Sequence, residues 1–216
     1  RASLDRYDDA GFIDQPFIVK VLGVSEPDSP RGSDELAPRK DTNSQESVTA
    51  KVAIRWQPTD NFDATLTYYS QTEDNGGRTI SAQRGELATG KWENAQRVAE
   101  PNQEETSLLA LEVIADLGFA ELTSATGSSK YEEQGQRDQT DLLISLEYSY
   151  ETFPTFTALT REDDRLETFS QELRLVSQGD SELSWIVGAF YNKEEYVGSS
   201  AEYTPELADF FGSSRT

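Results

Sequence analysis

Apolar and polar residues alternate in short runs along this chain, and residues 167–196 show the pattern most clearly. Before a small polar turn at residues 178–181, Phe169, Leu173 and Leu175 fall on one side of the alternation, opposite Glu172 and Arg174. After the turn, one side carries Leu183, Trp185, Val187, Ala189 and Tyr191. Because successive side chains of a strand point to opposite faces, the segment predicts a β-hairpin with one apolar face.

The same alternation predicts strands along most of the chain. The runs are rich in Val, Thr, Tyr and Leu, which favour strands, and Pro58, Asn61 and Gly118 mark turns between them. The fold class that follows is all-β, an antiparallel up-and-down meander. It has about nine predicted strands, at residues 2–7, 48–57, 64–69, 107–115, 119–131, 141–150, 155–161, 169–176 and 183–192.

The predicted connections alternate in length. Those after residues 57, 115, 150 and 177 are tight, whereas those at residues 14–47, 72–105, 132–140 and 162–167 are longer. All tight turns therefore lie at one end of the sheet, which is typical of outer-membrane barrels with short periplasmic turns and long outer loops. An odd number of strands does not suit a closed antiparallel barrel, so we expect an open, partial wall of a larger barrel.

The two faces of the predicted strands differ in charge, but alternation alone does not say which face meets water. In a barrel the apolar face contacts lipid, whereas in a soluble sandwich it forms the core. Six aromatic residues lie toward strand ends, as girdle aromatics do, which favours the barrel. They are Trp56, Tyr68, Tyr148, Tyr150, Trp185 and Tyr191. The polar face would then line the lumen, and its candidate residues are Lys51, Arg55, Glu112, Glu147, Glu172 and Arg174.

Composition excludes several functions. The formal net charge of −21 argues against a nucleic-acid partner, because phosphate backbones are bound by clustered Lys and Arg. The absence of Cys, His and Met removes disulfides, thiolate or imidazole metal sites and His-dependent nucleophiles. Adjacent carboxylates are no more frequent than so acidic a composition implies. We therefore predict no enzyme, no catalytic residue, no cofactor and no metal site. A chain that starts at Arg1 and lacks Met is also expected to be a fragment.

Two predicted hairpins resemble those of TonB-dependent outer-membrane receptors. The sequence FSQELRLVSQGDSELSWIVGAFYNKEE at residues 169–195 looks like a receptor hairpin with a Ser-Gln-Glu-Leu-Arg-Leu strand and a Trp-hydrophobic-Gly-Ala-Phe-Tyr strand. The sequence VAIRWQPTDNFDATLTYYSQ at residues 52–71 is similar to the Arg-Trp-x-Pro-Thr-Asp hairpin of the same receptors. Weaker echoes occur in LGFAELTSATG and RYDDAGFID. The resemblance covers most strands and does not extend to the long loops.

This resemblance implies a 22-stranded barrel with an N-terminal plug, which imports ferric siderophores, cobalamin or sugars with energy passed from TonB. Residues 1–216 would be part of that barrel domain, without the plug, the TonB box or the C-terminal strands. The implied location is the outer membrane of a Gram-negative bacterium. The implied partners are outer-membrane lipid, the receptor's own plug, TonB and a small nutrient. A soluble, secreted β-sandwich that binds glycan or protein is the alternative, and a passive porin lies between the two.

The long connections are the predicted recognition surface, because binding residues concentrate on loops held by a rigid scaffold. Residues 14–47 and 72–105 are far longer than a hairpin requires, and their acidity favours a neutral or cationic ligand over a free anion. Trp92, Tyr131 and Tyr203 are the aromatic residues proposed to contact that ligand.

Overall fold

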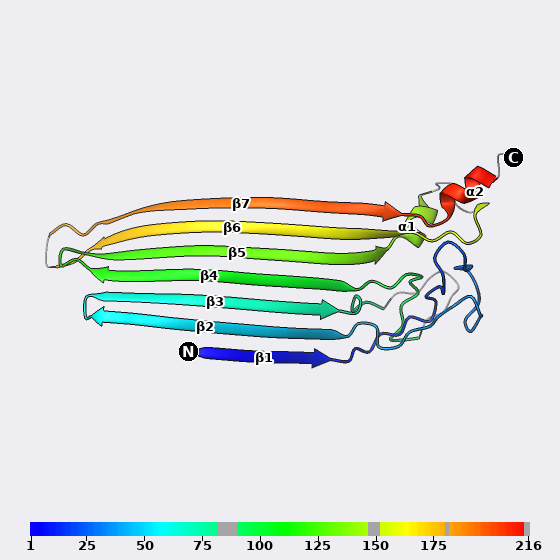
Figure 1. The fold of residues 1–216 in the computed structure, drawn as a ribbon, viewed down its shortest axis with the longest axis horizontal. Helices are drawn as coiled ribbons and strands as arrows, with labels where there is room; N and C mark the ends of the chain where they lie inside the picture. Colours follow the sequence, from blue (N-terminus) through cyan, green and yellow to red (C-terminus); the bar gives the residue numbers. More distant parts are fainter. Residues whose placement is uncertain (82–89, 147–151, 180–181, 214–216) are drawn as a thin grey trace.

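A computed structural model describes residues 1–81, 90–146, 152–179 and 182–213 of the chain. Within these residues, seven antiparallel strands form one open sheet in chain order, with each strand bonded to its sequence neighbours. Figure 1 shows the strands side by side in a single layer, with both helices at the end where the long loops lie. The elements are β1 Ala2–Asp9, β2 Gln45–Thr59, β3 Phe62–Asn75, β4 Asn102–Asp116, β5 Ala120–Asp138, α1 Thr140–Ser145, β6 Leu159–Ser177, β7 Ile186–Tyr203 and α2 Leu207–Ser213.

Short and long connections alternate, as the sequence predicts, but the tight connection predicted after residue 150 falls within a long loop instead. Residues 60–61, 117–119 and 178–185 join strands at one end of the sheet, whereas residues 10–44, 76–101 and 139–158 form three long loops at the other. In the turn after β4, Gly118 adopts a φ of 83°, and its N–H donates to the Asp116 carboxylate over 2.8 Å. Glycine suits this turn because positive φ is costly for residues with a Cβ.

One predicted strand, at residues 141–150, is not a strand where the structure describes it. Residues 141–145 belong to α1, and residues 147–150, which include Glu147, lie outside the described residues. Leu142, Ile144 and Leu146 alternate in sequence, but the helix buries Leu143 against Phe153 and Phe156 instead. A short apolar run fits a helix or a strand equally well, and packing within the loop selects the helix here.

The observed strands are also longer than predicted. Residues 132–138 belong to β5 and residues 162–167 to β6, although both segments were expected to be connections. Residues 159–161 and 169–176 are consequently parts of one strand, β6. This merger and the replacement of the predicted strand at 141–150 reduce the nine predicted strands to seven. Backbone ladder bonds hold these segments in the sheet, although Leu166 is their one aliphatic side chain.

The hydrophobic core of the described residues lies in the loops rather than against the sheet. Phe17, Val19, Leu36 and Ala95 form one buried cluster. A second cluster combines Leu143, Phe153, Phe156 and Ala158 with Leu207 and Phe210. Apart from Ala120 and Leu159 at strand ends, every buried apolar residue of the described chain is in a long loop or in α1. We call the three long loops together the loop layer.

Candidate functional site

The register of the strands aligns their apolar side chains into an apolar band on one face of the sheet, which hydroxyl side chains of β5 interrupt. One row across β2 to β7 consists of Trp56, Ala64, Val113, Ser124, Leu173 and Ala189. The next row toward the loop layer consists of Ile54, Leu66, Leu111, Thr126, Gln171 and Tyr191. The band is bare: Ile54 is 62% exposed, Trp56 61% and Val187 56%.

Aromatic residues lie toward the two margins of the apolar band. Phe62 and Trp56 pack edge-to-face near the short turns, with ring centroids 5.4 Å apart. Tyr68 and Phe169 lie in the row of the band that is nearest the loop layer, in register with Val52 and Leu109. From the row of Phe62 to that row the band extends roughly 20 Å along the strands, since each row advances two residues.

The opposite face, which we call the polar face, carries the residues predicted to line a lumen, together with the exposed Ile186 and Phe190 of β7. Arg55, Glu112 and Glu172 lie in one register row, and Lys51 and Arg174 share their face. Arg55 forms an ion pair with Asp63 across the β2–β3 hairpin. The sequence therefore groups these five residues correctly on one side of the sheet.

Nearer the loop layer, the polar face carries four carboxylates in one register row. Glu73, Glu104, Glu133 and Asp164 are successive neighbours across β3 to β6. Like charges placed opposite one another destabilise a sheet, so neighbouring polar groups must offset the repulsion. They do so through side-chain donors, which are Gln45 and Asn75 to Glu73, Asn102 to Glu104, Tyr131 to Glu133 and Tyr196 to Asp164.

Arg97 joins the three long loops at the centre of the loop layer. Its side chain is fully buried and binds Asp28 at 2.9 Å and Asp141, while its Nε donates to the Pro27 carbonyl at 3.1 Å. These partners come from the first and third loops, whereas Arg97 belongs to the second. Because a buried charge is costly unless it is paired and hydrogen-bonded, the three loops must fold together.

Asp138, the last residue of β5, accepts hydrogen bonds from the backbone N–H groups of Arg97, Val98 and Thr140. Burial raises the pKa of this carboxyl to about 6, despite the hydrogen bonds that favour its charged form. Close by, Arg78 binds the buried Glu100 through two nitrogens at 2.5 Å, and that hydrogen bonding raises the pKa of the guanidinium further. The loop layer is therefore held by desolvated charges as well as by its apolar clusters.

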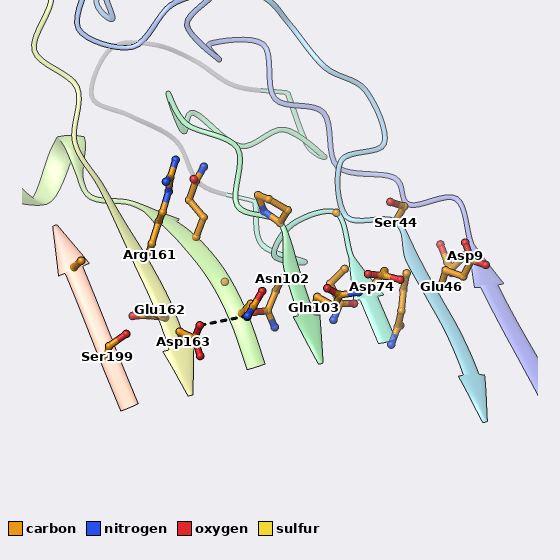
Figure 2. A pocket seen from close by; sticks show the side chains of 18 of the residues that line it. Asp9, Ser44, Glu46, Asp74, Asn102, Gln103, Arg161, Glu162, Asp163 and Ser199 are labelled. Atoms are coloured by element: carbon orange, nitrogen blue, oxygen red, sulfur yellow. Dashed lines mark hydrogen bonds between the residues drawn. The ribbon is translucent and has the colours of Figure 1, made fainter. Parts of the chain in front are cut away.

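A groove crosses all seven strands at the junction of the sheet with the loop layer (Figure 2). Its volume is about 790 Å³, and it lies on the face that carries the apolar band. One register row forms its floor, which consists of Asp8, Glu46, Asp74, Gln103, Gln134, Asp163 and Ser199. Gln134 donates to Asp163 over 3.3 Å, the contact dashed in Figure 2. The floor is therefore a strip of amides, carboxylates and a hydroxyl.

The structure does not bring the three aromatic ligand-contact candidates together. Trp92 is in the loop layer, 52% exposed and packed edge-to-face on Phe12. Tyr131 lies on the polar face of β5, where its hydroxyl donates to Glu133. Tyr203 lines the groove at the end of β7, with the Arg161 guanidinium 5.0 Å from its ring centre.

The sequence does not reveal the floor of the groove, because its polar residues lie beyond the apolar alternation and predict connections rather than strands. Gln134 and Asp163, for example, lie in segments that were expected to be loops. The signal that identifies them is positional. Gln134 and Asp163 lie an even number of residues from the band positions of β5 and β6, so they are on the same face of these strands, nearer the long loops.

Among the described residues, no helix is long and apolar enough to cross a membrane. No protein-family model, curated protein or solved structure gives a significant match to the chain.

Proposed function

We propose that the chain is part of a TonB-dependent outer-membrane receptor that imports a scarce nutrient, such as a ferric siderophore. In this proposal the strands form part of the wall of a 22-stranded barrel, and the loop layer is on the outside of the cell. The observation that carries the proposal is the bare apolar band on a single-layer sheet. The hairpins at residues 52–71 and 169–195, which resemble those of the receptors, contribute the band's most exposed side chains.

The apolar band has the margins of a bilayer-facing surface and covers part of the height of an outer-membrane barrel's apolar band. An outer-membrane barrel has an outward apolar band roughly 25 Å tall with aromatic girdles at both margins. The rows from Phe62 to Tyr68 extend roughly 20 Å along the strands, which is about 15 Å of bilayer depth at a strand tilt of 35–45°, before side-chain length is added. Aromatic residues lie toward both margins. Contact with lipid would cover Ile54, Trp56 and Val187, which are more than half exposed.

The exposure of β3 supports placing the polar face on the inside of the curve. The exposed residues within β3 are Leu66, Tyr68 and Asp74, and all three belong to the face of the apolar band. Side chains on the opposite face of β3 are all half-buried. Crowding of this kind is expected on the concave side of a curved sheet. It is a feature of β3, whereas Lys51, Arg55, Glu112, Glu172 and Arg174, on the same face of other strands, are exposed.

Strand direction supports continuation of the sheet beyond the chain. Six antiparallel pairings separate β1 from β7, so these two edge strands run in the same direction. They cannot pair with each other in an antiparallel barrel, which requires an even number of strands. An odd number of further strands would satisfy both edges. The plug and the TonB-binding segment would also be outside this chain.

The loop layer and the acidic rows bear on the kind of ligand. The polar face carries Glu73, Glu104, Glu133 and Asp164 in one row, and the whole chain has a net charge of −21. Such a field repels free anions, so we favour a neutral or cationic complex as cargo. Because the first and second loops share the buried cluster of Phe17, Val19, Leu36 and Ala95, they would act as one recognition surface.

The alternative is a soluble, secreted β-sandwich. A sandwich needs a second sheet packed on the apolar face. In the part of the chain that the structure describes, all strands belong to one sheet and its apolar face is bare. This observation favours the receptor wall.

The test uses the full-length protein that contains this chain. We expect it to fractionate with outer membranes, to resist extraction by alkaline carbonate and to require detergent to remain monodisperse. A protein that remains monodisperse without detergent would contradict the proposal. Uptake of labelled ferric siderophore, cobalamin or oligosaccharide, with and without TonB, would then identify the nutrient class.

A further inference from the structure

The two apolar clusters of the loop layer belong to different loops. Phe17, Val19 and Leu36 of the first loop pack with Ala95 of the second. The other cluster joins the third loop to α2, and its Phe153 and Phe210 rings stack with centroids 4.6 Å apart (Figure 1). Among the described residues the clusters share no member. We call the described residues of the first and second loops lobe 1, and those of the third loop with residues 204–213 lobe 2.

The two lobes meet through polar groups at two points, and we call this boundary the seam. At the first point, the Arg97 guanidinium of lobe 1 pairs with the Asp141 carboxylate of lobe 2. At the second point, the Gly23 N–H of lobe 1 donates to the Thr157 hydroxyl over 2.8 Å. The Thr155 hydroxyl donates back to the Gly23 carbonyl over 2.7 Å. The seam therefore differs in chemistry from the apolar interior of either lobe.

We propose that the loop layer opens along the seam as two lobes, with the Arg97–Asp141 pair as its latch. The seam itself rests on contacts within the loop layer. That its opening admits a nutrient rests on the proposed function. Opening of this kind leaves the first and second loops together as one recognition surface, while the third loop and α2 move relative to them.

Separation at the seam costs less than unfolding of a lobe. After separation, Arg97 keeps Asp28 and the Pro27 carbonyl, which both belong to lobe 1. The buried guanidinium regains hydration, which offsets the loss of its pair with Asp141. Each cluster also keeps its own contacts, whereas unfolding of a lobe exposes large apolar side chains such as Phe17. The seam is therefore the boundary at which the loop layer opens first.

Glycine permits the close approach of the lobes at the second point. Gly23 has a φ of 73°, and a Cβ at this position would lie 2.5 Å from the Pro205 carbonyl oxygen of lobe 2. Gly32, in the same loop, has a φ of 83°, but a Cβ there would meet no described atom within 4 Å outside its chain neighbours. Gly23→Ala therefore places a wedge in the seam, whereas Gly32→Ala adds similar backbone strain without a clash.

The first measurement is the distance between the lobes in the full-length protein in detergent solution. Asp34→Cys in lobe 1 and Asp209→Cys in lobe 2 place spin labels at exposed positions. The chain has no Cys of its own, and any Cys elsewhere in the protein is replaced by Ser. Double electron–electron resonance then gives the distribution of label distances. We expect one dominant distance and a minor population at a longer distance, which is the open seam.

Two pairs of variants test the latch and the wedge. Asp141→Asn removes the carboxylate that pairs with Arg97 across the seam, whereas its control Asp28→Asn removes the one within lobe 1. Gly23→Ala has Gly32→Ala as its control. The longer-distance population should rise at least about threefold in Asp141→Asn and Gly23→Ala, and less than about twofold in the controls.

Hydrogen exchange distinguishes opening of the seam from unfolding of a lobe. The Ala37 N–H donates to the Ile18 carbonyl over 2.7 Å and reports on lobe 1. The Phe156 N–H donates to the Phe153 carbonyl over 2.9 Å and reports on lobe 2. The exchange rates of both amides should change less than about twofold in Asp141→Asn and Gly23→Ala.

Unchanged label distances in both seam variants would overturn the proposal. Exchange at Ala37 and Phe156 that accelerates in step with the longer-distance population would also overturn it, because the loop layer would then unfold as one body. Equal effects of Asp141→Asn and Asp28→Asn would overturn the assignment of the latch. Failure of the proposed function would be seen separately, as a protein that needs no detergent, and the label distances would then still test the seam.

Discussion

The substitution Leu173→Arg, compared with Glu172→Arg, tests which face of the sheet contacts lipid. The two residues are adjacent in β6 and lie on opposite faces. Leu173 is 45% exposed in the apolar band, in register with Ser124 and Ala189. Glu172 is on the polar face, in register with Ala125 and Phe190. The pair therefore introduces the same side chain at nearly the same height on the two sides of the wall.

The expected cost follows from the depth of Leu173 in the band. Leu173 is two residues from Leu175 and four from Phe169, or about 7 and 14 Å along the strand. With strands tilted by 35–45°, these distances correspond to roughly 5 and 10 Å of bilayer depth. The penalty for Arg at the bilayer midplane is about 2–4 kcal/mol and falls toward the interfaces, so Leu173→Arg should cost about 2–3 kcal/mol. Glu172→Arg should cost less than about 1 kcal/mol, because Glu172 is exposed on the face opposite the band, where a charged side chain is already present.

The assay is reversible urea unfolding of the full-length protein in lipid vesicles, followed by tryptophan fluorescence. The difference between the free energies of unfolding of the two variants should be at least about 1 kcal/mol, with Leu173→Arg the less stable. Equal penalties, or a larger penalty for Glu172→Arg, would refute the assignment of the apolar band to lipid.

Three further predictions concern the loop layer and the polar face, and each can be read in the full-length protein. Arg97→Met should lower the opening free energy of the loop layer, measured by amide exchange, by about 2–4 kcal/mol. The control Arg31→Met removes a half-exposed ion pair with Glu93 and should cost about 1 kcal/mol. Similar losses in the two variants would contradict the role of burial. Because the pKa of Asp138 is raised to about 6, its stabilising contribution is present in acid and is lost as the pH rises. The opening free energy at Val98 should thus be roughly 1–3 kcal/mol higher at about pH 4 than at about pH 7, and an unchanged pH profile in Asp138→Asn would refute this cause. Glu104→Gln should stabilise the sheet against urea by about 0.2–1 kcal/mol, since it relieves repulsion from Glu73 and Glu133; a loss of stability would contradict that reasoning.

Alternation predicted the strands well where one face is apolar. The runs at residues 48–57, 64–69 and 107–115 lie within β2, β3 and β4, and the faces of Arg55, Glu112 and Glu172 were grouped correctly. Beyond the apolar band both faces are polar, so β5 and β6 continue through segments that have no alternation to detect. Their ladder bonds depend on the backbone rather than on side-chain type.

Packing between distant loops could not be predicted from local patterns. Arg97 is one of many charged residues in an acidic chain, and nothing near it in sequence indicates complete burial. Its partners Asp28 and Asp141 are 69 and 44 residues away. The helix at Leu143 also depends on contacts that are distant in sequence. Phe153, Phe156 and Phe210 pack around Leu143 and favour the helix over a strand.

The nearest-neighbour order of the strands has a consequence for how the protein folds. Each strand pairs only with the strand before it and the strand after it, so the sheet can grow one hairpin at a time. The short hairpins β2–β3 and β4–β5 close with little loss of chain entropy, and even the 10–44 loop adds only a modest cost, since closure entropy grows slowly with length. At every stage the growing sheet presents one unpaired edge to the next strand to arrive. A strand from another molecule could pair with the same edge, so addition of the next strand of the chain competes with aggregation during folding.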